Sequence, residues 1–351
     1  MSLFLPTDIE EIIDRIGGDA AMLSGKRVLL AGGGGFLGRY FVETFRRLNG
    51  FVLDKPCQIT VLDSFITSES GDRQADDANF EFVEHDIVQP LDVDGTYDYV
   101  VHAAGIASPY YYRAYPLQAL EVSTIGCRNL LELAKRDDAR FVFFSSSEVY
   151  GDPDPKHVPM AESYRGNVAT AGPRACYDEG KRAGETMCHI FHDSFGVHTN
   201  CIRPFNVYGP GMSETDYRVL PNFASCIAGD RPVNIYGSGN QTRTYCYITD
   251  AIVGFSLVML KGVAGAIYNI GAPEPEVSVE KLLDQMESAL GRSIARQSVE
   301  YPDSYPGDEP QRRCPDIRKA HLQLGYSAEV ALAEGLKRFL DWTADHYTGD
   351  A

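Results

Sequence analysis

The feature that most constrains this chain is an alternation, from residue 26 onward, of short apolar runs with longer helical stretches. Segments typical of strands cover residues 26–32, 58–64, 80–86, 97–105 and 140–151. Most of their positions are apolar, as expected for strands that are covered on both faces. Helical patterns over 38–48 and 117–136 separate several of them. This alternation predicts an α/β protein with a Rossmann-type, doubly wound parallel sheet.

The pattern changes after about residue 205, where Pro and Gly become more frequent. Short runs typical of strands (233–237, 244–250, 266–271) then accompany helical patterns near 277–290 and 328–346. We therefore predict a Rossmann domain over 25–205 and a smaller α/β lobe over 206–351, interwoven with the first. Residues 1–24 form a helical extension in this scheme. There, Thr7 and Glu10 have capping-box spacing at the start of an amphipathic pattern formed by Ile9, Ile12, Ile13 and Ile16.

Charge and composition exclude several classes of partner. The net charge of −17 opposes binding to nucleic acid or to an anionic membrane. The first residues lack the basic and apolar regions of a signal peptide, and no apolar run approaches the ~18 residues of a membrane span. The eight cysteines show no C-x-x-C spacing and are typical of reduced thiols, which predicts a cytoplasmic protein. His189 and His192 lack a third ligand at a suitable spacing, so we predict no metal site.

A glycine-rich turn, AGGGGFLGRY, stands between the first predicted strand and the first predicted helix. Glycines at such a turn let backbone N–H groups approach a pyrophosphate at the helix N-terminus. Asp63 ends the second predicted strand, where its carboxylate is placed to accept hydrogen bonds from a ribose. Its charge would repel a 2′-phosphate, so the cofactor we predict is NAD rather than NADP. The predicted cofactor contacts in the first third of the chain are Gly32, Gly35, Phe36, Leu37, Gly38, Asp63, Asp86, Ile87, Ala103 and Ala104, and Tyr177 and Lys181 complete the set.

Tyr177 and Lys181 lie four residues apart in a predicted helix. This spacing brings their Cβ atoms to ~5–6 Å, so the lysine can reach both the cofactor ribose and the surroundings of the phenol. The phenol is neutral at pH 7, because its ordinary pKa is ~10. A neighbouring ammonium and a bound nicotinamide would favour the phenolate, which would then act as a base toward a sugar hydroxyl. The preceding strand ends in SSSEVYG, so hydroxyls and a carboxylate can converge on the phenol.

Several segments resemble the UDP-glucuronate decarboxylases, which are nucleotide-sugar-modifying members of the extended short-chain dehydrogenase/reductase superfamily. They are SSSEVYGDP, GPRACYDEGKRAGETMC, RPFNVYGPGM, VNIYGSGNQTRTYCYITD and RRCPDIRKAHLQLGY. The G-x-x-G-x-x-G spacing of the turn is also similar to that superfamily. The resemblance covers roughly residues 26 to 342. It departs from the family at Ser146, where a threonine is usual, and at Cys314, where a basic residue is usual.

The resemblance implies roles for individual residues. The catalytic residues it implies are Ser146, Ser147, Glu148, Tyr177 and Lys181. The substrate-binding residues we assign with it are Arg174, Asn206, Arg218, Tyr236, Arg243 and Arg313. Within that set, Arg218 and Arg243 are expected at the diphosphate, and Arg313 at the glucuronate end. It also implies a homodimer, in which helices 117–136 and 177–195 of two chains form a four-helix interface. The cluster Tyr110–Tyr112 is interpreted either as core or as pocket lining.

The residue types favour decarboxylation over related reactions. In each of them the tyrosine takes the C4 hydroxyl proton while NAD accepts the C4 hydride. A 4,6-dehydratase needs an acid to expel the C6 hydroxyl, and Ser147 is a poor one. A 4-epimerase has no need of Glu148. With a glucuronate, oxidation at C4 gives a β-keto acid that loses CO₂, Ser146 and Tyr177 stabilise the enolate, and a Glu148-linked water protonates C5. Epimerase or dehydratase activity, and a non-catalytic NAD-binding scaffold, remain the alternatives.

Overall fold

The structure is a computed structural model that describes residues 3–67, 77–300 and 310–350. Its centre is a sheet of seven parallel strands in the order β11-β6-β5-β4-β1-β2-β3. The prediction of a doubly wound parallel sheet is confirmed. The strands are β1 (Arg27–Ala31), β2 (Gln58–Asp63), β3 (Phe80–Glu84), β4 (Tyr99–His102), β5 (Arg140–Phe144), β6 (Thr199–Pro204) and β11 (Ile267–Ile270).

The strand order reverses at β1, which pairs with β2 on one side and with β4 on the other. In doubly wound sheets, ligands bind in the crevice outside the carboxyl ends of the strands at such a reversal. Strand β1 is buried over Val28–Ala31, as are most positions of β2, β4 and β5. This burial on both faces explains why the sequence runs are continuously apolar.

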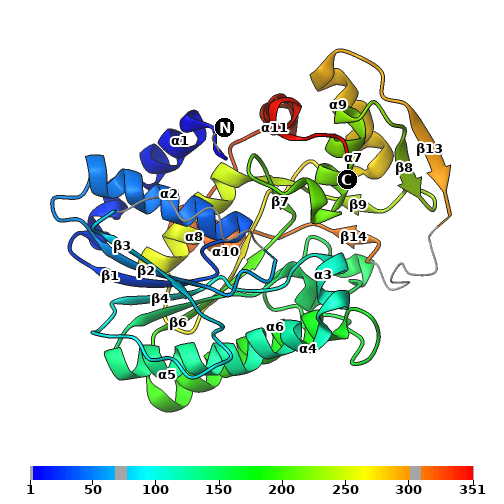
Figure 1. Ribbon diagram of the computed structural model, residues 1–351. Coiled ribbons are helices and arrows are strands. Elements are labelled where there is room, and N and C mark those ends of the chain that lie inside the picture. Colours follow the sequence, from blue (N-terminus) through cyan, green and yellow to red (C-terminus); the bar gives the residue numbers. More distant parts are fainter. Residues whose placement is uncertain (1–2, 68–76, 301–309, 351) are drawn as a thin grey trace.

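Helices cover both faces of the sheet (Figure 1). On one side lie α4 (Pro116–Glu121), α5 (Cys127–Asp137) and α6 (Ala175–Phe195), with α2 (Phe36–Phe51), α8 (Ile248–Lys261) and α10 (Arg318–Leu324) on the other. Each layer has its own apolar core, one built on α5 and α6 and a larger one built on α2 and α8. The layers hold the carboxyl ends of the strands in register.

Short elements from the second half of the chain form a lobe beside the strand ends. Strand β8 (Val233–Tyr236) pairs with β13 (Arg296–Val299), and β9 (Thr242–Arg243) lies between β12 (Val277–Ser278) and β14 (Arg312–Arg313). The remaining elements of the lobe and its borders are α3 (Pro109–Ala114), β7 (Val207–Tyr208), α7 (Val219–Ala228), β10 (Cys246–Tyr247), α9 (Val279–Leu290) and α11 (Leu332–His346).

Local predictions differ from the structure at several points, among them the strand expected over 140–151, which ends at Phe144 and is followed by a 3₁₀ turn over Ser147–Tyr150. The helix expected over 117–136 is α4 and α5 joined by a π-helical turn over Val122–Gly126. The strand expected over 244–250 ends at Tyr247, because Ile248 begins the long buried helix α8. The strand expected over 266–271 forms, but it joins the edge of the main sheet as β11 rather than the smaller lobe. Short apolar runs do not distinguish buried strand from buried helix, and this explains the error at Ile248.

The N-terminal extension forms the predicted amphipathic helix, α1 (Pro6–Ile16), which packs on α2 and α8. The predicted capping box is wrong. Pro6 opens the helix, Leu5 is its N-cap without a side-chain hydrogen bond, and Thr7 already lies inside the first turn. Asp8 is fully buried instead, where it accepts hydrogen bonds from the Tyr247 hydroxyl (2.7 Å) and from Arg338 (3.1 Å).

No helix within the described ranges is long and apolar enough to cross a membrane. The same residues contain no group of three or more potential His, Cys, Asp or Glu ligands for a metal ion. All eight cysteines are free, and seven of them are buried.

Candidate active site

The glycine-rich turn lies at the carboxyl end of β1, and α2 begins directly after it at Phe36. Gly32 has a φ of +90°, and a Cβ atom there would lie 2.4 Å from the backbone nitrogen of Ala104. At Gly38 a Cβ would lie 2.0 Å from the carbonyl oxygen of Gly32. A Cβ at Gly35 would find its nearest neighbour at 3.6 Å. Gly32 and Gly38 are therefore required by packing, whereas Gly35 borders open space.

A cleft of about 690 Å³ opens beside this turn, at the strand-order reversal. It is lined by predicted cofactor contacts from four strand ends, namely Gly32, Gly35, Asp63, Asp86, Ile87, Ala103 and Ala104. Phe36, Leu37 and Gly38 form the first turn of α2 rather than this wall. The Asp63 carboxylate accepts hydrogen bonds from the backbone N–H groups of Gly34 and Phe65, both at 2.8 Å. These bonds fix the carboxylate at the rim of the cleft.

The sequence did not identify His85, Gln118 or Val122, which also line this cleft. His85 precedes Asp86 directly after β3, and its Nε2 atom is buried with no hydrogen-bond partner in the described part of the chain. The position of His85 beside the predicted Asp86 is a signal that sequence reasoning had available. Gln118 and Val122 come from α4 and the π-helical turn, so only the tertiary structure places them here.

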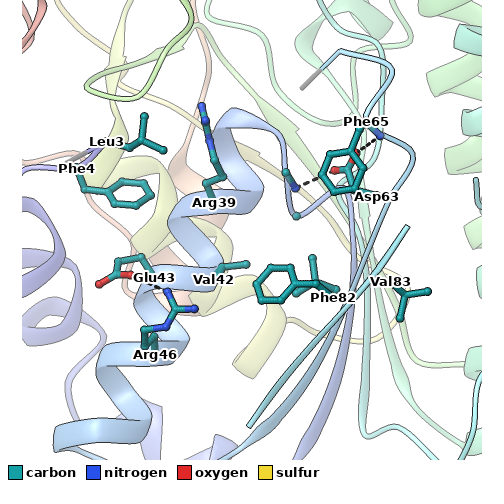
Figure 2. Close-up of a pocket in the computed structure, with 13 residues that line it drawn as sticks. Leu3, Phe4, Arg39, Val42, Glu43, Arg46, Asp63, Phe65, Phe82 and Val83 are labelled. Carbon is teal, nitrogen blue, oxygen red and sulfur yellow. Dashed lines mark hydrogen bonds and ion pairs between the residues drawn. The ribbon is translucent and has the colours of Figure 1, made fainter. Parts of the chain in front are cut away.

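A second cavity of about 590 Å³ shares Asp63 with the cleft (Figure 2). Arg39, Val42, Glu43 and Arg46 project into it from α2, opposite Phe82 and Val83 of β3, and the N-terminal extension contributes Leu3 and Phe4. The sequence did not predict this cavity, because it depends on how the extension packs against α2.

Tyr177 lies on the first turn of α6 and is 6% exposed. Its ring stacks on that of Tyr112, with centroids 5.5 Å apart and an angle of 16° between the planes. Burial raises the pKa of Tyr177 to about 12, against a hydrogen bond with the Ser146 hydroxyl that lowers it. The phenol is therefore protonated at neutral pH in the protein alone.

Lys181 follows Tyr177 by four residues on α6 and lies buried beside its ring. Its Nζ atom donates a hydrogen bond of 2.7 Å to the carbonyl of Phe144 and lies 5.7 Å from the centre of the Tyr177 ring. Burial lowers the pKa of Lys181 to about 8. A Cβ atom on Gly105 would lie 3.1 Å from Nζ, so the ammonium borders the wall of the cofactor cleft. The lysine therefore lies between the cleft and the phenol, and burial is the largest influence on the pKa of that phenol in the protein alone.

Glu148 is held between two arginines. It follows Ser147 in a 3₁₀ turn, η4 (Ser147–Tyr150), and forms ion pairs with Arg174 and, at 2.6 Å, with Arg313. Burial alone would raise the pKa of Glu148, but the guanidinium groups of Arg313, Arg174 and the more distant Arg243 lower it to about 2. Glu148 is thus a permanent carboxylate at neutral pH.

Ser147 and Arg313 are also in contact, since Arg313 Nη1 donates to Ser147 Oγ at 3.1 Å. The structure therefore brings together all of the predicted catalytic residues and two of the predicted substrate-binding arginines, Arg174 and Arg313. Cys314, beside Arg313, is buried and its thiol donates to the carbonyl of Pro273 at 3.2 Å. Its side chain stabilises the loop rather than facing Glu148.

Two of the other predicted substrate-binding residues, Arg218 and Arg243, act electrostatically on this cluster. Arg218 forms a bidentate ion pair with Asp216 (2.5 and 2.6 Å) and lies within electrostatic range of Tyr177. Arg243 donates to the carbonyls of Thr242 and Pro310 at 2.9 and 2.6 Å. The remaining two are Asn206, with a φ of +42° and its amide on the Thr244 carbonyl at 2.8 Å, and Tyr236, which ends β8.

The tyrosine cluster contains one core residue, Tyr112, and one surface residue, Tyr110. Tyr112 is 1% exposed, against the catalytic phenol, and its buried hydroxyl has no hydrogen-bond partner among the residues described. Tyr110 is 55% exposed and packs against Tyr217, with ring centroids 4.7 Å apart.

NAD fits the residues that are present. The cleft provides an open glycine position for a pyrophosphate, a carboxylate at the end of β2 for a ribose, and Lys181 with Tyr177 near its other end. Together, the doubly wound sheet and this site define an NAD-binding enzyme of the extended short-chain dehydrogenase/reductase class.

Comparisons with known proteins agree with this class. The NAD dependent epimerase/dehydratase family matches residues 28–271. UDP-glucuronic acid decarboxylase 1 of Xenopus tropicalis is 38% identical over 321 residues, which are 90% of this chain and 72% of that protein. The Arabidopsis thaliana protein of the same name is 35% identical, over 90% of this chain and 69% of its own length. The chain belongs to the NAD dependent epimerase/dehydratase family, and within it to the UDP-glucuronate decarboxylases.

Solved structures of the same family are similar over nearly the whole chain. UDP-glucuronic acid 4-epimerase of Bacillus cereus, in complex with UDP-glucuronic acid and NAD, has a TM-score of 0.77 and 25% identity, covering 92% of this chain and 100% of that one. The dTDP-glucose 4,6-dehydratase DesIV of Streptomyces venezuelae, with NAD and TYD bound, also has a TM-score of 0.77 and 25% identity, covering 91% of this chain and 97% of that one.

Proposed function

We propose that the protein is an NAD-dependent carboxy-lyase that converts UDP-glucuronate to UDP-xylose through a C4-keto intermediate. The observation that carries this proposal is the Glu148 carboxylate between Arg174 and Arg313, beside Ser146 and Tyr177. Two guanidinium groups around a single carboxylate leave positive charge for a second one, and a glucuronate brings it. The identity to UDP-glucuronic acid decarboxylases over 90% of the chain supports the same substrate.

Bound in the cleft, NAD would supply reversible hydride transfer at C4 of the sugar, and it would therefore be recycled. Tyr177 takes the proton of the C4 hydroxyl. Its pKa of about 12 in the protein alone means that the positive charge of the bound nicotinamide is needed to favour the phenolate. Lys181 holds the cofactor ribose, and its ammonium lies close enough to assist.

The chain's hydroxyls then act on the β-keto acid. As the bond to CO₂ breaks, its electrons move toward the C4 carbonyl, and Ser146 with Tyr177 donates hydrogen bonds to the developing enolate. Arg313 and Arg174 orient the carboxylate before it leaves. The proposed nucleotide contacts are Asn206, Arg218, Tyr236 and Arg243.

The substrate experiment separates the three readings. The purified protein is incubated with UDP-glucuronate and NAD⁺, and both CO₂ and the mass of the nucleotide sugar are followed. We expect release of CO₂ and a nucleotide sugar whose mass is lower than that of UDP-glucuronate by the mass of CO₂. An isomer of unchanged mass would instead support a 4-epimerase, the activity named for the Bacillus cereus neighbour. No detectable reaction with UDP-glucuronate or with other nucleotide sugars would support a non-catalytic NAD-binding scaffold.

We also propose a homodimer that forms through α4, α5 and α6. These helices pack side by side on one face of the sheet (Figure 1). They expose apolar side chains, which are Leu117, Ile190 and Phe195, together with Ile125 of the π-helical turn.

A cytoplasmic location and the division of the chain into 1–24, 25–205 and 206–351 are further parts of the proposal. The eight free cysteines support a reducing compartment.

A further inference from the structure

Asp178 is a buried acid that the proposed reaction has not used. It follows Tyr177 on α6 and is 6% exposed. One carboxylate oxygen, Oδ2, lies 3.7 Å from Nε of Arg174. The other, Oδ1, is buried and has no hydrogen-bond partner in the ranges that the structure describes. Buried polar atoms are almost always paired, so an unpaired carboxylate oxygen beside the catalytic phenol calls for a functional explanation.

The charged and titratable groups that act on Asp178 come from several elements. They are Glu148 of η4, Arg313 of β14, Arg174 and Glu179 beside it on the α6 side, and the phenols of Tyr177 and Tyr112. Arg174 serves both carboxylates, because it pairs directly with Glu148 and more distantly with Asp178. Glu148 has Arg313 in addition.

This arrangement separates the two acids. Glu148 is ionised, with its pKa lowered to about 2 by the arginines. Burial, followed by the negative charge of Glu148, raises the pKa of Asp178 to about 7, against the opposing effect of Arg174. Two neighbouring carboxylates with different surroundings commonly divide their roles in this way. At neutral pH, Asp178 is the member of the pair that can hold a proton.

The proposed reaction needs such a proton. When the bond between C5 and the carboxylate breaks, its electron pair enters the enolate, and CO₂ leaves without a proton. C5 must then form a C–H bond, while the proton on Tyr177 returns to the C4 oxygen during the final reduction. One proton from solvent is therefore consumed in each turnover, and Glu148, held as a carboxylate, can orient a water molecule but cannot supply it.

We propose that Asp178 is the proton reserve of this site, and that its carboxylic acid passes a proton through a Glu148-bound water to C5 after CO₂ has left. The water gives its proton to C5 and takes one from Asp178, which solvent then reprotonates. Asp178 acts through the water, so it is a positioning residue. This inference rests on the proposed decarboxylation.

The test compares full-length wild type, Asp178→Asn and the matched control Glu179→Gln, each with UDP-glucuronate and NAD⁺ across pH 5.5–9. Wild-type kcat is expected to fall as pH rises through about 7, where Asp178 loses its proton. Asp178→Asn is expected to lower kcat by roughly 100-fold, the usual size of a general-acid contribution, and to abolish this limb of the profile. Its KM should change little, and the reduced nicotinamide signal should accumulate. Glu179→Gln should resemble wild type.

Several outcomes would overturn the inference. One is a wild-type kcat in Asp178→Asn with the same fall of kcat as pH rises. Another is a raised KM with unchanged kcat, because Asp178 would then merely orient Arg174. If Asp178→Asn does not fold, Asp178→Glu and the wild-type pH profile decide. The kcat of Asp178→Glu must still fall as pH rises, because the longer side chain keeps a carboxylic acid. The proposal is overturned if this fall is missing in Asp178→Glu or in wild type. Failure of wild type to release CO₂ would instead refute the proposed function.

Discussion

The carboxylate of Glu148 lies 2.6 Å from Nη1 of Arg313, a guanidinium that is only 1% exposed. Strand β14 and the turn after β5 bring these residues together from distant parts of the chain. A buried ion pair is costly unless its charges are well compensated. Here the excess of guanidinium over carboxylate suits an anionic sugar, and the proposed choice of substrate rests on this relationship.

Arg313→Ala should lower kcat/KM for UDP-glucuronate by roughly 10–100-fold, the equivalent of one hydrogen bond to a charged group. Steady-state kinetics measure this loss. Arg312→Ala is the matched control, since Arg312 is half-exposed and pairs with Glu276 instead. A kcat/KM equal to that of wild type in Arg313→Ala would remove Arg313 from the site.

Asp178→Asn should change how stability depends on pH. The pKa of Asp178 is raised from 3.8 to about 7 by burial and by Glu148. Between these values the folded state keeps a proton that the unfolded state releases, so wild-type stability should decline as pH rises from about 4 to 7. Asp178 should contribute on the order of 1 kcal/mol per pH unit to this decline, and the variant should lack that contribution. Melting temperatures across this range test the prediction, and parallel curves would contradict it.

Gly35→Ala should separate cofactor binding from folding. A Cβ at this position meets no atom closer than 3.6 Å, so the melting temperature should stay near that of wild type, while the methyl group weakens NAD binding at the turn. Calorimetric titration with NAD⁺ measures the second effect. Gly50→Ala, later in α2 and with no neighbour within 4 Å, should leave NAD affinity unchanged. Equal affinity in Gly35→Ala and wild type would place the pyrophosphate elsewhere.

Ile12→Ala should show that the N-terminal extension is part of the fold. Ile12 is fully buried in the core shared with α8, so its truncation should cost about 2–5 kcal/mol of unfolding free energy. Ile13→Ala, at a partly buried neighbouring position, should cost clearly less. Denaturant unfolding measures both. A loss below about 1 kcal/mol for Ile12→Ala would mean that α1 is dispensable.

The sequence predicted most of the sheet because β1, β2, β4 and β5 are apolar runs whose burial on both faces leaves a strong pattern. Helix ends and short strands were less predictable. The capping box at Thr7 failed because Pro6 starts α1 one residue earlier, and the run around Tyr247 resembled a strand although a buried helix follows.

For the site, motifs located Tyr177, Lys181 and Glu148, whereas their electrostatics depended on tertiary packing. Burial is the largest influence on the pKa of Tyr177, and no spacing in the sequence reveals burial. The same holds for Asp178, which in the sequence is one charge among many in a helix. Its role emerges only when β14 and η4 bring Arg313 and Glu148 beside it.

The most direct test of the account is hydride transfer in Tyr177→Phe, followed by reduced nicotinamide and by CO₂ after mixing with NAD⁺ and UDP-glucuronate. The account predicts a folded variant that binds NAD but yields neither signal, because no group remains to take the C4 hydroxyl proton. Turnover at the wild-type rate in this variant would contradict it.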